Sequence, residues 1–110
     1  DLDGVSGANR VCVLGDGPVI SFMDNRTIYD RKLFELGFAV AKENNIPAQT
    51  KTTVAGGNDA GAIQTSGDGA RVMAISLPTR YIHSGASVVK ASDIDETRRL
   101  LKALLPKLTD

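Results

Sequence analysis

The only histidine of the chain, His83, lies six residues after the end of its longest apolar run. That run, residues 72–77, is too short for a typical helix and ends at Pro78, which predicts a strand buried on both faces. His83 would then lie just beyond the carboxyl end of a strand, where open α/β sheets bind ligands. An imidazole in that position could ligate a metal ion or transfer a proton. A single histidine in a small domain can equally be an ordinary hydrogen-bonded or surface residue, so both interpretations stay open at this point.

Asp59 is a second candidate, because it lies in a glycine-bearing stretch that follows a β-prone segment at residues 48–54. Its carboxylate would be available to a substrate amine or to a group surrounding a metal ion. The alternative is purely structural, since Asn58 or Asp59 could simply cap a short helix that begins there. Residue types alone do not separate these two interpretations.

Other familiar chemistries are poorly supported. A zinc site needs about three or four protein ligands, which one histidine and one cysteine cannot supply by themselves. Ser84 and His83 could join an aspartate in a triad, but the sequence has no Gly-x-Ser-x-Gly turn. The Gly-x-Gly at residues 15–17 lacks the third glycine and the following helix of a phosphate-binding loop.

The composition excludes several classes of protein. Thirteen basic and thirteen acidic residues cancel, which disfavours nucleic acid and anionic membranes as partners. No stretch approaches the roughly 20 apolar residues of a membrane span. Cys12 lies between two valines, which predicts a small buried hydrophobe; with no second cysteine, a reducing, cytoplasmic location fits. Because the 110 residues begin at Asp1 without methionine, we expect a fragment or a processed product of one domain.

Strand-like and helical segments alternate along the chain. The predicted order is a hairpin of residues 11–14 and 18–23, a helix over 27–44, a strand over 48–54, a short helix from 58–59, a strand over 72–77 and a last helix from Ser92. Capping-box spacings, Thr27 with Asp30 and Ser92 with Asp95, predict where the two long helices begin. This order predicts an α/β fold with a mixed sheet and flanking helices.

Three motifs support a more specific hypothesis. They are Leu-Gly-Asp-Gly-Pro-Val-Ile at 14–20, Gly-Gly-Asn-Asp-Ala-Gly-Ala-Ile at 56–63 and Leu-Pro-Thr-Arg-Tyr-Ile-His-Ser at 77–84. Together they resemble the C-terminal portion of metallopeptidase family forty-two, over essentially the whole chain. Members of this family are dinuclear aminopeptidases that assemble as tetrahedral dodecamers, and some are labelled glutamyl aminopeptidase, cellulase M or endoglucanase. The resemblance implies that residues 1–110 are the C-terminal part of a zinc-peptidase-like (phosphorylase/hydrolase-like) catalytic domain.

The resemblance also implies roles for individual positions. His83 matches the last metal ligand of the family, which binds one of two zinc or cobalt ions. Asn58 stands where the family motif has threonine. The implied substrate-binding positions are Gly57, Asp59 and Arg80.

Most of the family's catalytic groups have no counterpart in these 110 residues. The general-base glutamate and the other ligands are expected upstream, although Asp1 or Asp3 could be the acidic ligand that precedes the first motif. The resemblance therefore implies part of a metal-dependent enzyme that removes N-terminal residues from peptides, with this chain inactive alone. Two alternatives stay open: a non-catalytic α/β binding module, and an endoglucanase. The chain has no tryptophan and only three phenylalanines and two tyrosines, which does not favour a carbohydrate cleft.

Overall fold

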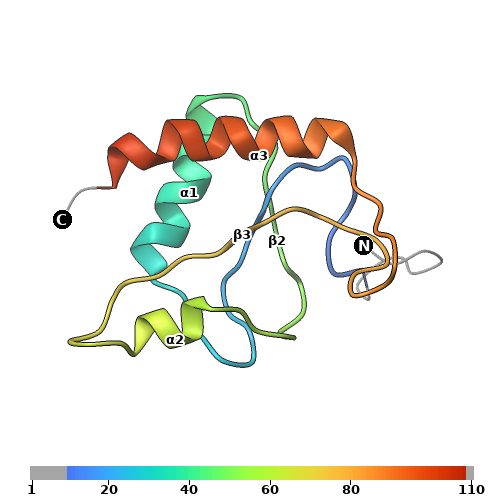
Figure 1. Cartoon of the computed structure of the whole chain (residues 1–110). Coiled ribbons are helices and arrows are strands. Elements are labelled where there is room, and N and C mark those ends of the chain that lie inside the picture. The colour runs from blue at the N-terminus through green and yellow to red at the C-terminus, as the bar shows by residue number, and fades with distance from the viewer. Residues whose placement is uncertain (1–9, 109–110) are drawn as a thin grey trace.

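The computed structural model describes residues 10–108 and shows a small mixed sheet with helices packed around it (Figure 1). Its strands are β1 (Val19–Ile20), β2 (Gln49–Thr50) and β3 (Ile75–Ser76). Its helices are α1 (Arg31–Glu43), α2 (Ala60–Gln64), α3 (Ala91–Leu104) and a short 3-10 helix, η2 (Leu105–Lys107). The predicted α/β fold with a mixed sheet is confirmed.

The sheet has the order β2-β1-β3, with β1 in the centre. β1 runs parallel to β2, where Val19 pairs with Gln49, and antiparallel to β3, where Val19 pairs with Ser76. β1 is buried along its length, as its central position requires. The connection from β1 to its parallel neighbour β2 passes through α1, as parallel neighbours require.

The hydrophobic core lies where α1 and α3 pack against each other and against β1 (Figure 1). Each element contributes an apolar side: β1 gives Ile20, α1 gives Val40, and α3 gives Leu100 and Leu104. Leu100 and Leu104 are four residues apart, so they lie on one side of α3, as the helical period requires. Among the described residues no helix has the length and hydropathy needed to cross a membrane.

The predicted N-terminal hairpin is wrong. Residues 11–14 form no strand, and β1 pairs with β2 and β3 instead. The reason lies in α3, where the carboxylate of Asp93 is buried and accepts hydrogen bonds from the backbone N–H groups of Gly15 (2.8 Å) and Gly17 (3.0 Å). Gly17 has a φ of +83°, and a Cβ there would lie 2.0 Å from the carbonyl oxygen of Pro47. The turn is therefore shaped by a distant carboxylate and not by pairing of its two arms.

Both predicted capping boxes are also wrong in detail. α3 begins at Ala91, so Ser92 lies within the helix, and the N-cap position is Lys90, whose ammonium cannot accept a hydrogen bond from the helix N–H groups. α1 begins at Arg31, and its N-cap is Asp30, whose carboxylate accepts a hydrogen bond from the Leu33 N–H (2.9 Å). Thr27 is buried before the helix, and its Oγ1 has no hydrogen-bond partner among residues 10–108.

The run at residues 72–77 is not buried on both faces as predicted. It contains the short strand β3, but only Val72 is buried and Ser76 is exposed. The physical reason is that β3 lies at one side of the three-stranded sheet and Ser76 borders a pocket. Cys12, predicted to be buried, is half-buried and borders the same pocket.

Candidate functional site

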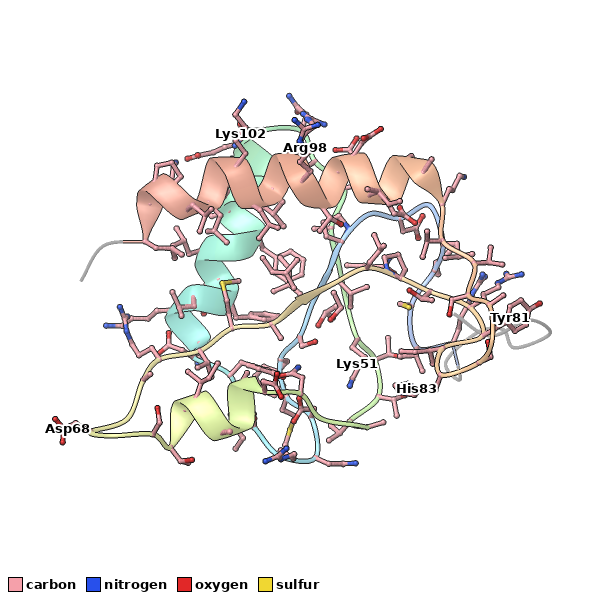
Figure 2. The ribbon with its side chains drawn as sticks, viewed as in Figure 1. Lys51, Asp68, Tyr81, His83, Arg98 and Lys102 are labelled. Atoms are coloured by element: carbon pink, nitrogen blue, oxygen red, sulfur yellow. The ribbon has the colours of Figure 1, made fainter. Side chains whose placement is uncertain are left out.

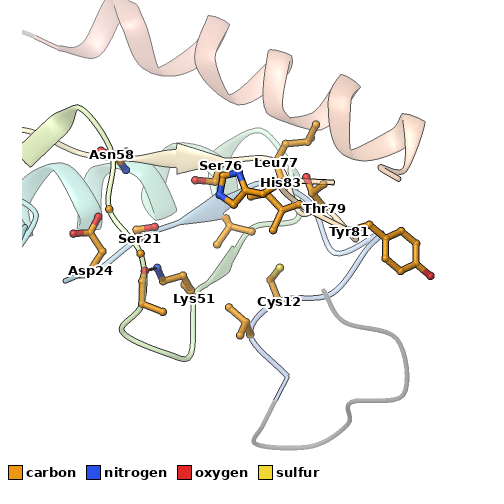
Figure 3. A pocket seen from close by; sticks show the side chains of 16 residues that line it. Cys12, Ser21, Asp24, Lys51, Asn58, Ser76, Leu77, Thr79, Tyr81 and His83 are labelled. Atoms are coloured by element: carbon orange, nitrogen blue, oxygen red, sulfur yellow. Dashed lines mark hydrogen bonds between the residues drawn. The ribbon is translucent and has the colours of Figure 1, made fainter. Parts of the chain in front are cut away.

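A pocket with a volume of about 470 Å³ lies beside the sheet, between the loop that carries His83 and the loop that follows β2 (Figure 3). Its walls come from four parts of the chain. They are the segment before β1, with Val11 and Cys12; β1 and the residues after it, with Val19, Ser21 and Asp24; the loop after β2, with Lys51, Ala55, Gly56, Gly57 and Asn58; and the β3 end with the His83 loop, with Ser76, Leu77, Thr79, Tyr81, Ile82 and His83. All three sequence motifs therefore meet at one pocket, the first of them through Val19.

The loop that carries His83 is closed at its base by a pair of backbone hydrogen bonds between Arg80 and Val88, of 2.9 and 3.1 Å. The carbonyl oxygen of Tyr81 accepts hydrogen bonds from the hydroxyl groups of Ser84 and Ser87. Because backbone and side-chain bonds close the same short loop, its conformation is defined although its residues are exposed.

His83 has a φ of +62° and Tyr81 a φ of +60°, so two residues with side chains occupy the left-handed region. This conformation is uncommon for residues other than glycine, and such strain gathers at functional sites. The imidazole is exposed and lies at the pocket, as Figures 2 and 3 show. A ring in that position is accessible to an ion or ligand from the pocket side.

The described residues fit only part of a metal site. Residues 10–108 contain no group of three or more histidine, cysteine, aspartate or glutamate side chains that could hold a metal ion. His83 offers one coordination position, while the carboxylate of Asp24, in the same pocket, already accepts hydrogen bonds from protein groups. Asp1 and Asp3, the predicted alternative ligands, lie outside the described residues.

The predicted substrate-binding residues do not all reach the pocket. Gly57 is part of its wall, but Asp59 and Arg80 are not among the residues that line it. Asp59 is exposed at the start of α2 and makes no side-chain cap hydrogen bond. Asn58 caps this helix instead, since its Oδ1 accepts a hydrogen bond from the N–H of Ala60 (2.9 Å).

Sequence reasoning missed Asp24, which is 5% exposed in the pocket wall. Its Oδ1 accepts hydrogen bonds from the N–H groups of Arg26 (2.8 Å) and Thr27 (2.9 Å), and its Oδ2 accepts one from the Tyr29 hydroxyl. Burial alone would raise the pKa of Asp24, but these three hydrogen bonds and the charge of Lys51 outweigh it and lower the pKa. The signal in the sequence was the Asp-Asn-Arg-Thr pattern, typical of an aspartate that caps its own turn.

Tyr29 is buried, and burial raises the pKa of its hydroxyl, with a further contribution from Asp24. At neutral pH the pair therefore consists of a carboxylate and a neutral phenol, in which the phenol donates. The stabilisation that Asp24 provides is present above its ordinary pKa of 3.8 and is lost as the pH falls through its lower folded value.

Comparison with known proteins connects this geometry with one family. The sequence profile of the M42 glutamyl aminopeptidases matches residues 2–100. The lysyl aminopeptidase of Pyrococcus furiosus is 36% identical over 96 residues, which cover 86% of this chain and 27% of that protein.

Solved structures agree in fold. The structure of the aminopeptidase APDkam598 from the archaeon Desulfurococcus kamchatkensis superposes with a TM-score of 0.91 at 33% identity, over 99% of this chain and 31% of that one. The dodecameric PhTET1, of Pyrococcus horikoshii, gives a TM-score of 0.76 at 35% identity, over 84% and 27% of the two chains. The chain thus spans somewhat less than a third of the length of these relatives.

Proposed function

Because the chain belongs to the M42 glutamyl aminopeptidase family, we propose that it forms the C-terminal part of the catalytic domain of a metal-dependent aminopeptidase. In this proposal His83 supplies one ligand to a centre of two divalent ions, zinc or cobalt. The observation that carries it is the exposed imidazole on a strained, internally bonded loop at the pocket.

The other ligands and the general-base glutamate come, in this proposal, from parts of the domain outside residues 10–108. Two metal ions would supply a water of lowered pKa and polarise the scissile carbonyl of a peptide. In this proposal the chain contributes one imidazole and one wall to the site. No catalytic residue of its own is proposed.

The wall includes Gly57, which lines the pocket, and extends to Asp59, the residue that follows the lining residue Asn58. Arg80 belongs to the proposal through its backbone, which closes the base of the His83 loop. Peptides with a free amino terminus are the proposed substrates, and this wall would face them.

Assembly and location complete the proposal. The relative PhTET1 is dodecameric, and we propose a homo-oligomer of the same kind for the natural protein. A single cysteine fits a reducing cytoplasm.

The test is the substitution His83→Ala in the natural protein, with its metal content and its hydrolysis of amino-acid anilides as the two measurements. We expect loss of about one of two bound ions and a fall in activity greater than the roughly 10–100-fold that loss of an outer hydrogen-bond partner causes. Arg98→Ala, on the outer side of α3 (Figure 2), is the control and should change neither measurement. Unchanged metal content and activity in His83→Ala would overturn the proposal and favour a non-catalytic binding module.

A further inference from the structure

A chain of hydrogen bonds connects the segment after β1 with the glycine-rich loop on the pocket wall. It begins at Asp24, whose Oδ2 accepts a hydrogen bond from the Tyr29 hydroxyl. The same hydroxyl accepts a hydrogen bond from Nδ2 of Asn58 (3.0 Å). Asn58 in turn accepts the N–H of Ala60 at its Oδ1. The side-chain nitrogen of Asn58 donates one of these hydrogen bonds and its side-chain oxygen accepts another. The amide can therefore adopt only one orientation without losing both of them.

Two further contacts join the same segments, one between backbone groups and one between a side chain and the backbone. The N–H of Asn25 donates to the carbonyl oxygen of Gly56 (2.9 Å). Gly57 lies so close to the aliphatic part of Arg26 that a Cβ at Gly57 would be 2.7 Å from its Cδ. The segment after β1 and the glycine-rich loop are therefore already in contact, and the hydrogen bonds of Asp24, Tyr29 and Asn58 add to this contact.

The loop needs such contacts, because residues 54–58 form neither helix nor strand and are exposed. Apart from the contacts above, Lys51 donates from its Nζ to the carbonyl oxygen of Ala55. Loops without internal structure open at low free-energy cost unless other groups hold them. The position of this wall relative to His83 thus depends on a few identifiable hydrogen bonds.

We propose that Asp24, Tyr29 and Asn58 are positioning residues that hold the Gly56–Asn58 wall of the pocket at a defined distance from the His83 loop. This positioning role rests on the proposed aminopeptidase function only in that the wall would face a peptide substrate. Asp24 and Tyr29 are 5% and 3% exposed, so solvent competes little for their hydrogen bonds. None of the three is proposed to touch the reacting atoms.

The first experiment measures the wall itself, by amide hydrogen exchange in Tyr29→Phe and Asn58→Asp. Tyr29→Phe removes only the hydroxyl, whereas Asn58→Asp keeps the acceptor for Ala60 and removes the donor to Tyr29. Exchange of the Asn25 and Ala60 amides should become about tenfold faster in both variants, the effect of losing roughly one hydrogen bond. Exchange in α1 and α3 should not change.

Asn44→Ala is the matched control, because Nδ2 of Asn44 also donates a single hydrogen bond, to the carbonyl oxygen of Val40 at the end of α1. It should leave exchange at Asn25 and Ala60 as in the unsubstituted protein. Unchanged exchange in Tyr29→Phe and Asn58→Asp would overturn the proposal, as would equal acceleration throughout the chain, which would indicate general destabilisation.

The second experiment separates positioning from folding, by steady-state kinetics of the natural protein on amino-acid anilides. Tyr29→Phe should raise KM about three- to tenfold, with kcat and metal content nearly unchanged, since misplacing a wall weakens binding more than chemistry. A loss of kcat with loss of metal would overturn the positioning role. If the unsubstituted protein hydrolyses no anilide, the proposed aminopeptidase function fails, while the exchange experiment still decides whether these residues hold the wall.

Discussion

At the scale of the residue, side chains in and beside the pocket are in two different physical states. His83 is exposed and held in a left-handed conformation, whereas Asp24 and Tyr29 are buried and fully engaged with each other. An exposed ring keeps its nitrogen atoms accessible, while a buried carboxylate that already has three donors has little capacity left for an ion. This difference is why we assign ligand binding to His83 and positioning to Asp24.

The phenol of Tyr29 allows a direct test of this pair. In the 110-residue polypeptide with Tyr81→Phe, Tyr29 is the only tyrosine, and its phenolate absorbance should titrate above the ordinary pKa of 10.0. Adding Asp24→Asn removes the charge that opposes ionisation, so the pKa should fall toward 10.0. The stabilisation from neutral Tyr29 is complete below pH 10.0 and disappears as the pH rises through the raised pKa. A Tyr29 pKa that does not respond to Asp24→Asn would show that the two groups are uncoupled.

At the scale of the element, α3 does more than cover the core. Its first turn carries Asp93, which is 1% exposed and binds the turn before β1 through two backbone N–H groups. A buried carboxylate with such donors is stabilised by charge-assisted hydrogen bonds. These hydrogen bonds connect the start of α3 with the turn at residues 15–17, which leads into the central strand β1.

We expect Asp93→Asn to lower the free energy of unfolding by about 2 kcal/mol, because an amide cannot accept from both N–H groups as a carboxylate does. Urea denaturation followed by circular dichroism measures the change. Asp95→Asn, two residues along and exposed, is the control and should shift stability by less than about 0.5 kcal/mol. Equal effects of the two substitutions would contradict the structural role of Asp93.

At the scale of the whole molecule, the described residues leave a large amount of apolar side chain on the surface. The most exposed of these residues are Ile82 (66%), Ile28 (64%) and Leu105 (62%). Contiguous exposed apolar residues, such as Tyr81 and Ile82 in the His83 loop, indicate surfaces that contact other protein. Since the relatives are about three times as long as this chain, we expect further parts of the family's fold to cover some of them.

The 110-residue polypeptide alone should therefore hydrolyse no amino-acid anilide above the rate in buffer, with or without added zinc or cobalt. Its described residues offer one candidate ligand, whereas a catalytic zinc needs about three from the protein. A purified sample of defined mass, assayed beside an established aminopeptidase as positive control, provides the measurement. Turnover that depends on added metal would show that this chain completes a site by itself.

The sequence by itself determined the fold class, the two long helices and the candidate His83, because apolar periodicity and short motifs are local properties that survive without tertiary contacts. Tertiary structure decided the rest. The hairpin prediction failed because Asp93, which is 78 and 76 residues away from Gly15 and Gly17 along the chain, binds both glycines of the turn. Likewise, no local pattern could show that Tyr29 reaches Asn58, since this contact joins two segments that are 29 residues apart along the chain. Hydrogen bonds between distant segments depend on how the chain folds back, and only coordinates contain that information.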